Sequence, residues 1–241
     1  MKIEVHLDDD LIARKAAAII AADARAAVPS WGRFIMAVSG GRTPWLMLRA
    51  LAGEQLPWEN VHVVQVDERV APAGDPDRNL AHLRESLLNH APLLPSHIYA
   101  MPVEAPDLNH AAQQYAAVLQ ELAGSPPVLD LVHLGLGADG HTASLVPEDP
   151  VLDVTDADVT VTRPYQGRRR MTLTFPIINR SRRVLWLVTG REKARALVRL
   201  RDRDPSIPAS RVRHDRALVL ADRLAAEQLG TSENSETQND C

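Results

Sequence analysis

Residues 128–145 read VLDLVHLGLGADGHTASL and contain a buried strand followed directly by ionisable side chains. The first part, Val128 to Leu136, is almost continuously apolar, as expected of a parallel strand that is covered on both faces. Glycines then interrupt the run and precede a carboxylate, Asp139, and an imidazole, His141. In open α/β sheets, ligands bind beyond the carboxyl ends of the strands. The stretch therefore predicts an active site at Asp139 and His141.

A structural interpretation of the same two residues is also open. Asp is a favoured N-cap residue, so Asp139 can cap a short helix that follows it while His141 lies at the surface. An isolated Asp-x-His pair does not decide between the two interpretations.

Strand-like and helix-like segments alternate along the rest of the chain, which is typical of an α/β protein with a mainly parallel, doubly wound sheet and helices on both faces. The predicted strands are 2–7, 33–38, 61–66, 128–136, 184–188 and 217–221, and the predicted helices are 8–28, 45–51, 79–88, 108–123, 192–201 and 223–229. Polar and apolar residues alternate in Thr160–Arg163 and Arg169–Phe175, which predicts two antiparallel strands at an edge or flap. We expect one domain over residues 1–230 and a frayed polar tail over 231–241.

The composition narrows the class of protein. Hydrophobic residues make up 45% and charged residues 24%, which is ordinary for a soluble globular protein. The only cysteine is Cys241, so we expect no disulfide framework, no cysteine-based zinc site and a reducing, cytoplasmic location. No secretory signal or run long enough to span a bilayer is evident. The net charge of -4 argues against nucleic-acid binding, and we expect a monomer or a small homo-oligomer.

Positive charge is concentrated in the second half of the chain, because sixteen of the 27 Lys and Arg residues lie between Arg163 and Arg216. Most of them are expected on solvated helix faces, and two or three can serve an anionic ligand. Lys193 is one of only three lysines, so its compact ammonium group is a candidate for such a role.

A glycine turn between a predicted strand and a predicted helix forms a second candidate site. Free backbone N–H groups and the positive end of the helix converge there, as in a phosphate-binding loop. The spacing is not that of a P-loop or a dinucleotide fingerprint, and a tight turn explains the glycines equally well. The candidate residues are Ser39, Gly40, Gly41, Arg42 and Thr43.

Three charged residues, Asp67, Glu68 and Arg69, follow another predicted buried strand. Charges at such a position are costly unless they pair or bind a ligand. They are expected at the same rim of the sheet as His141, either as part of the site or as a structural salt bridge from Arg69 to Asp67 or Asp139.

Other catalytic motifs are missing from the sequence. It has no H-E-x-x-H motif, no cysteine cluster, no acidic calcium loop and no G-x-S-x-G elbow, so a required metal or a serine nucleophile is not expected. His133 lies within the predicted buried strand, which favours a hydrogen-bonded core residue. The remaining chemistry is general acid/base catalysis by His141 on a small anionic substrate.

Five motifs together closely resemble the 6-phosphogluconolactonases in order and spacing along nearly the whole chain. The motifs are SGGRTP at Ser39, VDERVAP at Val66, LGLGADGHTASLVP at Leu134, RMTLTFPIIN at Arg170 and VTGREKARAL at Val188. The resemblance implies an α/β fold related to the glucosamine-6-phosphate deaminases. It also implies hydrolysis of the phosphorylated sugar lactone 6-phosphoglucono-δ-lactone to 6-phosphogluconate, in the oxidative pentose phosphate pathway, without a cofactor.

The resemblance also implies roles for particular residues. His141 is the expected general base, oriented or tuned by Asp139, and Arg69 is expected to stabilise an oxyanion or to hold Asp67. Arg170 and Lys193 are expected to bind the substrate phosphate together with the glycine turn. The chain departs from the family pattern at two positions. Arg78 precedes Asn79 where a serine is frequent, and Arg42 stands where smaller residues are common.

Two alternative functions remain open on the sequence. A glucosamine-6-phosphate deaminase has a similar glycine loop and Asp-Gly-His motif, but usually carries Asp-Glu-Tyr where this chain has Asp67-Glu68-Arg69. A non-catalytic sugar-phosphate sensor of this fold would need an added DNA-binding segment, and no spare N-terminal helices are expected to supply one.

Overall fold

The computed structural model describes residues 1–230, so the tail predicted for 231–241 lies outside the described residues. Its centre is a seven-stranded parallel sheet in the order β1-β10-β9-β6-β2-β3-β5. The strands are β1 (Lys2–His6), β2 (Phe34–Val38), β3 (Val61–Gln65), β5 (Ile98–Tyr99), β6 (Leu131–Gly135), β9 (Arg183–Val188) and β10 (Ala217–Asp222).

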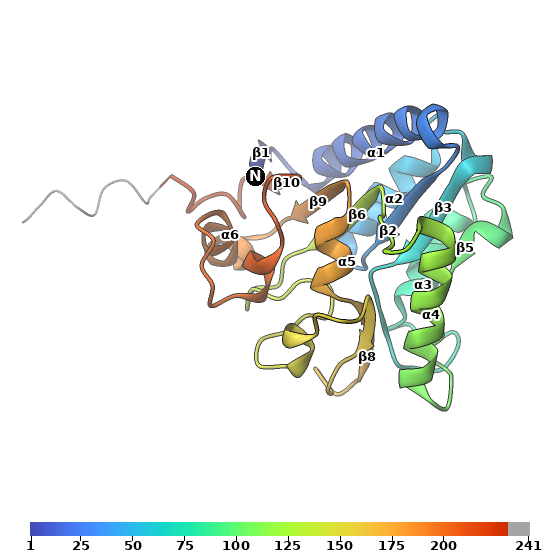
Figure 1. The fold of residues 1–241 in the computed structure, drawn as a ribbon. Helices are drawn as coiled ribbons and strands as arrows, with labels where there is room; N and C mark the ends of the chain where they lie inside the picture. Colours follow the sequence, from blue (N-terminus) through green and yellow to red (C-terminus); the bar gives the residue numbers. More distant parts are fainter. Residues whose placement is uncertain (231–241) are drawn as a thin grey trace, which may run out of the picture.

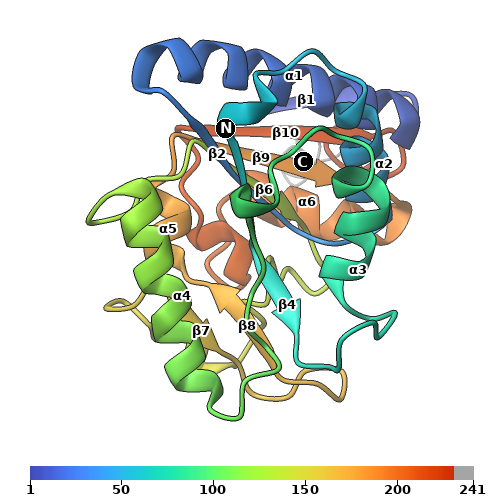
Figure 2. The same ribbon diagram turned by 90° about the vertical axis from the view of Figure 1, so that its right-hand side faces the viewer.

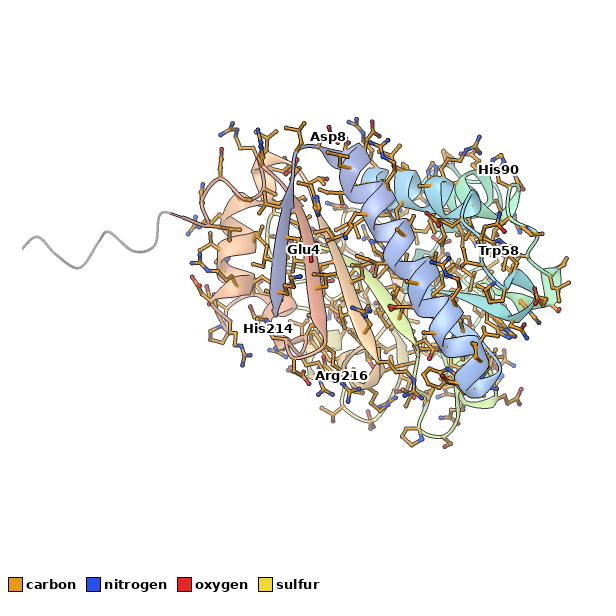
Figure 3. The ribbon with its side chains drawn as sticks, turned by 90° about the horizontal axis from the view of Figure 1, so that it is seen from above. Glu4, Asp8, Trp58, His90, His214 and Arg216 are labelled. Carbon is orange, nitrogen blue, oxygen red and sulfur yellow. The ribbon has the colours of Figure 1, made fainter. Side chains whose placement is uncertain are left out.

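Helices cover both faces of this sheet. The α-helices are α1 (Asp9–Trp31), α2 (Arg42–Ala52), α3 (Asn79–Leu83), α4 (Leu108–Ala123), α5 (Phe175–Arg180) and α6 (Ala194–Arg201). One apolar cluster contains residues of α1 and α2, and a second contains residues of α4, α5 and α6. Figures 1 and 2 show α1 on one face and α4 with α5 on the other, and in Figure 3 α1 crosses over the strands. The predicted doubly wound α/β fold is confirmed.

Local sequence explains where α1 begins and ends. The Asp8 carboxylate accepts a hydrogen bond from the Leu11 N–H (2.8 Å), so Asp8 is the N-cap. Alanine and isoleucine residues form the buried side of the helix, which packs on the sheet. Gly32 adopts a left-handed conformation (φ 79°) and ends the helix, a few residues beyond the predicted end at Val28.

The chain reverses its direction across the sheet between β2 and β6, and this reversal places the site. After β2 the chain proceeds to β3 and β5, whereas after β6 it proceeds to β9 and β10 on the other side. The loops that follow the two adjacent strands therefore separate and leave a crevice. The glycine turn follows β2 and the Asp139–His141 loop follows β6, so both border the same crevice.

A second, three-stranded antiparallel sheet has the order β4-β8-β7. It contains the two predicted antiparallel strands as β7 (Val159–Val161) and β8 (Arg170–Leu173), and β4 (Asp67–Arg69) pairs with β8. The sequence did not predict that residues 67–69 form a strand of their own. Their backbone pairs with β8, whose partner residues lie about a hundred positions later in the chain, and local pattern does not reveal such a pairing.

Several predicted helices differ from the structure. Residues 223–229 form turns instead of a helix, because the segment is too short to nucleate one, and its later N–H groups close three-residue turns such as that from Leu229 to the Ala226 carbonyl. Predicted helix 79–88 divides into α3 and the π-helix η2 (Arg84–Leu88), and the 192–201 helix begins as the 3₁₀ turn η5 (Arg191–Lys193). Helix α5, which begins where the predicted strand 169–175 ends, was not predicted. The remaining 3₁₀ turns are η1 (Trp58–Asn60), η3 (Pro95–His97), η4 (Pro150–Asp153) and η6 (Pro208–Arg211).

His133 is fully buried in β6, as predicted, and its Nδ1 accepts a hydrogen bond from the Ser39 N–H (3.3 Å). Burial lowers the pKa of His133 to about 3. Because this value lies below the pKa of about 6.5 of an unfolded histidine, the unfolded state binds the proton more readily. The contribution of uncharged His133 to the free energy of unfolding is present above pH 6.5. It is lost as pH falls toward the pKa of His133 in the folded state.

We expect protonation of His133 in the unfolded state to decrease the free energy of unfolding by up to about 1.4 kcal/mol per pH unit below pH 6.5. His133→Asn retains an acceptor for the Ser39 N–H but does not titrate, so its stability should depend less on pH. Denaturant unfolding of both proteins at pH 7 and pH 5 measures the difference. Equal pH dependence in the two proteins would contradict the assignment.

Candidate active site

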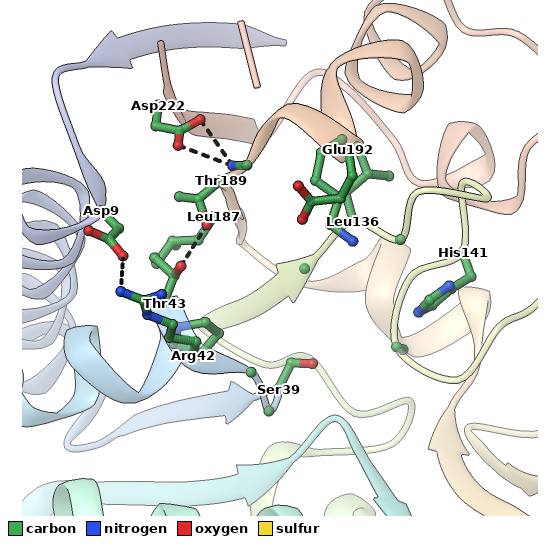
Figure 4. A pocket seen from close by; sticks show the side chains of 18 of the residues that line it. Asp9, Ser39, Arg42, Thr43, Leu136, His141, Leu187, Thr189, Glu192 and Asp222 are labelled. Carbon is green, nitrogen blue, oxygen red and sulfur yellow. Dashed lines mark hydrogen bonds and ion pairs between the residues drawn. The ribbon is translucent and has the colours of Figure 1, made fainter. Parts of the chain in front are cut away.

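A cavity of about 720 Å³ lies at the carboxyl ends of the parallel strands. Its lining comes from the loops after β1, β2, β3, β6, β9 and β10, together with Arg170 of β8. Of the candidate site residues named from the sequence, all but Asp139 and Glu68 line this cavity. In Figure 4, His141 lies across the cavity from Arg42 and Thr43. The fold thus brings together residues that are far apart in the sequence.

The glycine turn has donors available for an anion. Among residues 1–230, the N–H groups of Gly40 and Gly41 donate to no protein acceptor, whereas the Ser39 N–H is already bonded to His133. Helix α2 begins directly after Gly41, so its positive end faces the same space. The Thr43 hydroxyl is 2.7 Å from the Thr189 hydroxyl and ties this turn to the loop after β9.

Asp139 and His141 form a hydrogen-bonded pair at the cavity. Asp139 Oδ1 accepts from the His141 backbone N–H (3.1 Å) and lies 2.6 Å from His141 Nδ1. With Nδ1 donating its proton to the carboxylate, Nε2 is left as the basic nitrogen. Burial raises the pKa of Asp139, but His141 and the hydrogen bonds of the carboxylate outweigh it, and the net shift is downward. No helix follows, so the interpretation of Asp139 as a helix cap was wrong.

Gly137 is required by the close packing of this loop. A Cβ atom at position 137 would overlap the His141 ring and the Asp139 carboxylate. The glycine therefore allows the imidazole to lie against the backbone after β6.

The charged residues of β4 are held by hydrogen bonds. The buried Asp67 carboxylate accepts from the Ser144 hydroxyl (2.7 Å), and Arg69 Nη1 donates to Asn79 Oδ1 (2.6 Å) and to the Asp77 carbonyl (2.9 Å). Among the ion pairs of residues 1–230, none joins Arg69 to Asp67 or Asp139. The structural salt bridge considered for Arg69 was therefore wrong, because Asn79 and the Asp77 carbonyl take its guanidinium donors.

Glu68 has a structural role. It is fully buried and accepts hydrogen bonds from the first N–H groups of α3, those of Asn79 and Leu80, at 2.8 Å each. The Arg78 guanidinium lies 3.3 Å from Glu68 and 2.6 Å from Glu104. Arg78 is one of the two departures from the family pattern. Its side chain points away from the cavity and neutralises a buried carboxylate.

Arg170 is almost completely buried, with 6% of its surface exposed, and lines the cavity. Burial lowers the pKa of its guanidinium, although Asp67 acts in the opposite direction. Its Nη2 donates to Gln166 Oε1 (3.2 Å), and its Nε has no hydrogen-bond partner among the described residues. A buried arginine with an unused donor that faces a cavity is suited to bind an anion.

The cavity is lined by both signs of charge. Among residues 1–230, Arg69, Arg170 and Lys193 form no salt bridge. Of the lining acids, Asp222 accepts from the Gly190 N–H (3.1 Å), and Asp9 pairs with Arg42 (3.4 Å). Arg42 is the second departure from the family pattern. Its side chain is 83% exposed, so solvent accommodates its large size.

Sequence reasoning missed two residues at the site. Asn79 contacts Gly40 and holds Arg69, and Tyr165 donates a hydrogen bond to Asp139. Gly167, between the two alternating segments, was the one local signal that could have indicated a turn after Tyr165. Nothing local indicated its contact with Asp139.

The chain matches the family model described as glucosamine-6-phosphate isomerases/6-phosphogluconolactonase over residues 7–220. The chain belongs to this family. The 6-phosphogluconolactonase of Synechocystis sp. is 36% identical over 95% of this chain and 98% of that protein. The 6-phosphogluconolactonase of Mycobacterium tuberculosis is 37% identical over 94% of this chain and 98% of that protein.

Solved structures of the family have the same fold. The 6-phosphogluconolactonase from Thermotoga maritima superimposes with a TM-score of 0.80 at 27% identity and covers 92% of this chain and 98% of its own. A monomeric glucosamine-6-phosphate deaminase has a TM-score of 0.83 at 22% identity, with 94% of this chain and 99% of its own covered, and shares the fold.

Two further findings concern metals and membranes. No group of three or more His, Cys, Asp or Glu residues in the described part of the chain is arranged to hold a metal ion. No helix within 1–230 is both long and apolar enough to cross a bilayer.

Proposed function

We propose that this protein hydrolyses 6-phosphoglucono-δ-lactone to 6-phosphogluconate. The observation that carries the proposal is one cavity with the Asp139–His141 pair on one side and the unpaired cations Arg170 and Lys193 among its lining. Such a site has both a general base and an anion-binding region. The lactonase relatives, at 36% and 37% identity over most of both chains, support this activity over deamination.

His141 acts as the general base. Its Nε2 accepts a proton from water, and the water oxygen forms a bond to the C1 carbonyl carbon of the lactone. The carbonyl oxygen becomes an oxyanion, which then collapses and breaks the bond between C1 and the ring oxygen. The proton on His141 passes to the leaving ring oxygen, which becomes a hydroxyl group, and the new carboxylic acid ionises. Asp139 stabilises the imidazolium that forms in between.

The phosphate group binds away from the reacting carbonyl. The N–H groups of Gly40 and Gly41, the end of α2, Arg170 and Lys193 provide donors and positive charge for it. Lys193 is the last residue of the turn before α6, and its main chain is tied to the Gly190 carbonyl (3.0 Å). Binding energy at the phosphate positions the lactone against His141 and therefore contributes to kcat as well as to affinity.

Arg69 stabilises the developing oxyanion, held in place by Asn79. Removing a preorganised donor of this kind costs about 10²-fold or more in kcat. We expect Arg69→Lys to lose most of this contribution, because lysine keeps the charge but not the planar donor fork. Steady-state kinetics, with thermal unfolding as a check on folding, measures the effect. Near-full activity of Arg69→Lys would mean that Arg69 acts only as a diffuse charge.

A parallel substrate assay tests the function. Purified protein is given 6-phosphogluconolactone and, separately, glucosamine 6-phosphate. Lactone opening acidifies a weakly buffered solution beyond the spontaneous rate, whereas deamination releases ammonia. Ammonia release at a rate comparable to lactone opening would overturn the proposal, and absence of both activities would favour a sugar-phosphate sensor. The cytoplasmic location, the lack of nucleic-acid binding and the monomeric or small oligomeric state remain predictions from the sequence.

A further inference from the structure

The hairpin between β7 and β8 holds Tyr165 in a tight turn. The Tyr165 N–H donates to the Arg168 carbonyl (2.9 Å), and the Arg168 N–H donates to the Tyr165 carbonyl (3.3 Å). Between them, Gln166 and Gly167 both have positive φ angles, 52° and 80°. These values are typical of a two-residue hairpin turn whose twist matches that of its strands. The backbone of Tyr165 is therefore fixed.

A second set of contacts anchors the hairpin to the rest of the protein. Arg168 Nη2 lies 3.1 Å from an Asp75 carboxylate oxygen and 3.0 Å from an Asp77 oxygen, both in the loop before α3. The tip of the hairpin is thereby attached to the same loop whose Asp77 carbonyl accepts from Arg69.

The Tyr165 hydroxyl completes the hydrogen bonding of Asp139. It donates to Oδ2 (3.1 Å), while Oδ1 accepts from His141. The Tyr165 ring also meets the imidazole edge to face, with centroids 5.6 Å apart. Without the hydroxyl, Oδ2 has no donor among residues 1–230, and the side chain, 39% exposed, is held only through Oδ1 by the backbone N–H and the ring of His141. The backbone of the loop is held by its own hydrogen bonds, from the Gly137 N–H to the His141 carbonyl (2.8 Å) and from the Gly140 N–H to the Gly137 carbonyl (3.0 Å), so the hydroxyl acts on the Asp139 side chain and not on the loop.

The Tyr165 ring also supports the candidate phosphate ligand Arg170. The guanidinium carbon lies over the ring, 5.0 Å from its centroid, in a cation–π arrangement. The neighbouring Gln166 accepts from Arg170 Nη2. One side chain thus contacts both the Asp139–His141 pair and Arg170, although it does not line the cavity itself.

The protonation states agree with this arrangement. Burial, the hydrogen bond to Asp139 and its charge raise the pKa of Tyr165, and the pKa of Asp139 is lowered. At neutral pH the hydroxyl is therefore a donor and the carboxylate an ionised acceptor.

We propose that Tyr165 is a positioning residue whose hydroxyl orients Asp139, and through it His141, while its ring supports Arg170. The inference rests on the proposed lactonase function. Two variants separate the contributions of the hydroxyl and of the ring. Tyr165→Phe removes the hydroxyl and keeps the ring, whereas Tyr165→Ala removes both.

We expect Tyr165→Phe to lower kcat for 6-phosphogluconolactone about tenfold, because the carboxylate that orients the base loses one of its donors. Its KM should stay near that of the wild type, because the ring still supports Arg170. Tyr165→Ala should lower kcat similarly and also raise KM severalfold. Tyr99→Phe, which removes a tyrosine hydroxyl that bonds to His62 outside the cavity, is the matched control and should retain wild-type kinetics.

A double-mutant cycle with Asp139→Ala tests whether Tyr165 acts through Asp139. In the Asp139→Ala protein, adding Tyr165→Phe should produce no further decrease in kcat, whereas two independent structural defects would multiply. Thermal unfolding midpoints show whether each variant is folded. Unchanged kcat in Tyr165→Phe, or multiplying losses in the cycle, would overturn this inference and leave the lactonase function intact. Failure of the wild type to open the lactone would overturn the proposed function and the inference with it.

Discussion

His141→Ala is expected to lower kcat for 6-phosphogluconolactone by about 10² to 10⁴-fold, the usual range for loss of a general base. His141→Gln should be similarly impaired, because glutamine retains hydrogen-bonding capacity but cannot take up the proton from water. The lactone opens spontaneously, so the measurement is an enzymatic assay corrected for the uncatalysed rate. A normal KM combined with a low kcat would place the defect in the chemical step.

The matched control for this experiment is His110→Ala. His110 is an exposed histidine in the first turn of α4, outside the cavity, and its replacement should leave kcat unchanged. If His141→Ala retained wild-type kcat while folded, the general base would have to be another group.

Arg170→Ala and Lys193→Ala are each expected to lower kcat/KM for the phosphorylated lactone by about ten- to a hundredfold. A hydrogen bond to a charged group contributes about 1.5–3 kcal/mol of binding free energy. This free energy corresponds to about a ten- to hundredfold change in kcat/KM. Turnover of unphosphorylated gluconolactone should barely change, because it has no phosphate for these residues to bind. Kinetics with both substrates therefore measures recognition of the phosphate.

Arg195→Ala provides the control, because Arg195 is an exposed cation only two residues from Lys193 and outside the cavity. Its removal should affect neither substrate. Equal losses on both lactones in Arg170→Ala or Lys193→Ala would show that the residue does not bind the phosphate. For Arg170, whose side chain is buried, a thermal unfolding measurement separates loss of binding from loss of folding.

Local sequence was sufficient to predict most of the fold. The predicted strands at 61–66, 128–136 and 184–188 all lie within the central sheet, and mainly apolar runs such as 128–136 and 184–188 are typical of buried parallel strands. The glycines after β2 and β6 indicated where the backbone turns at the rim of the sheet. The Asp139–His141 contact was also predictable, since residues two positions apart in a glycine-rich turn remain close in any compact arrangement.

Pairings between distant segments could not be predicted in the same way. Residues 67–69 form a strand because β8 lies beside them. A local pattern describes which face of a segment is apolar, but it does not identify the partner of that segment. Arg78 shows the same limit, because the sequence marked it only as a departure from the family pattern, and only the fold shows that Glu68 and Glu104 take its charge.

The sequence by itself determined the parallel sheet, the loops at its rim and the identity of the ionisable groups they carry, because these depend on residues that are neighbours in the chain. Only the tertiary structure decided which of those groups are free to act. Asn79 holds Arg69, Ser144 holds Asp67, and Tyr165 holds Asp139. Each of these hydrogen bonds joins separate segments, and forms because packing of the two sheets and the helices brings its donor and acceptor within reach.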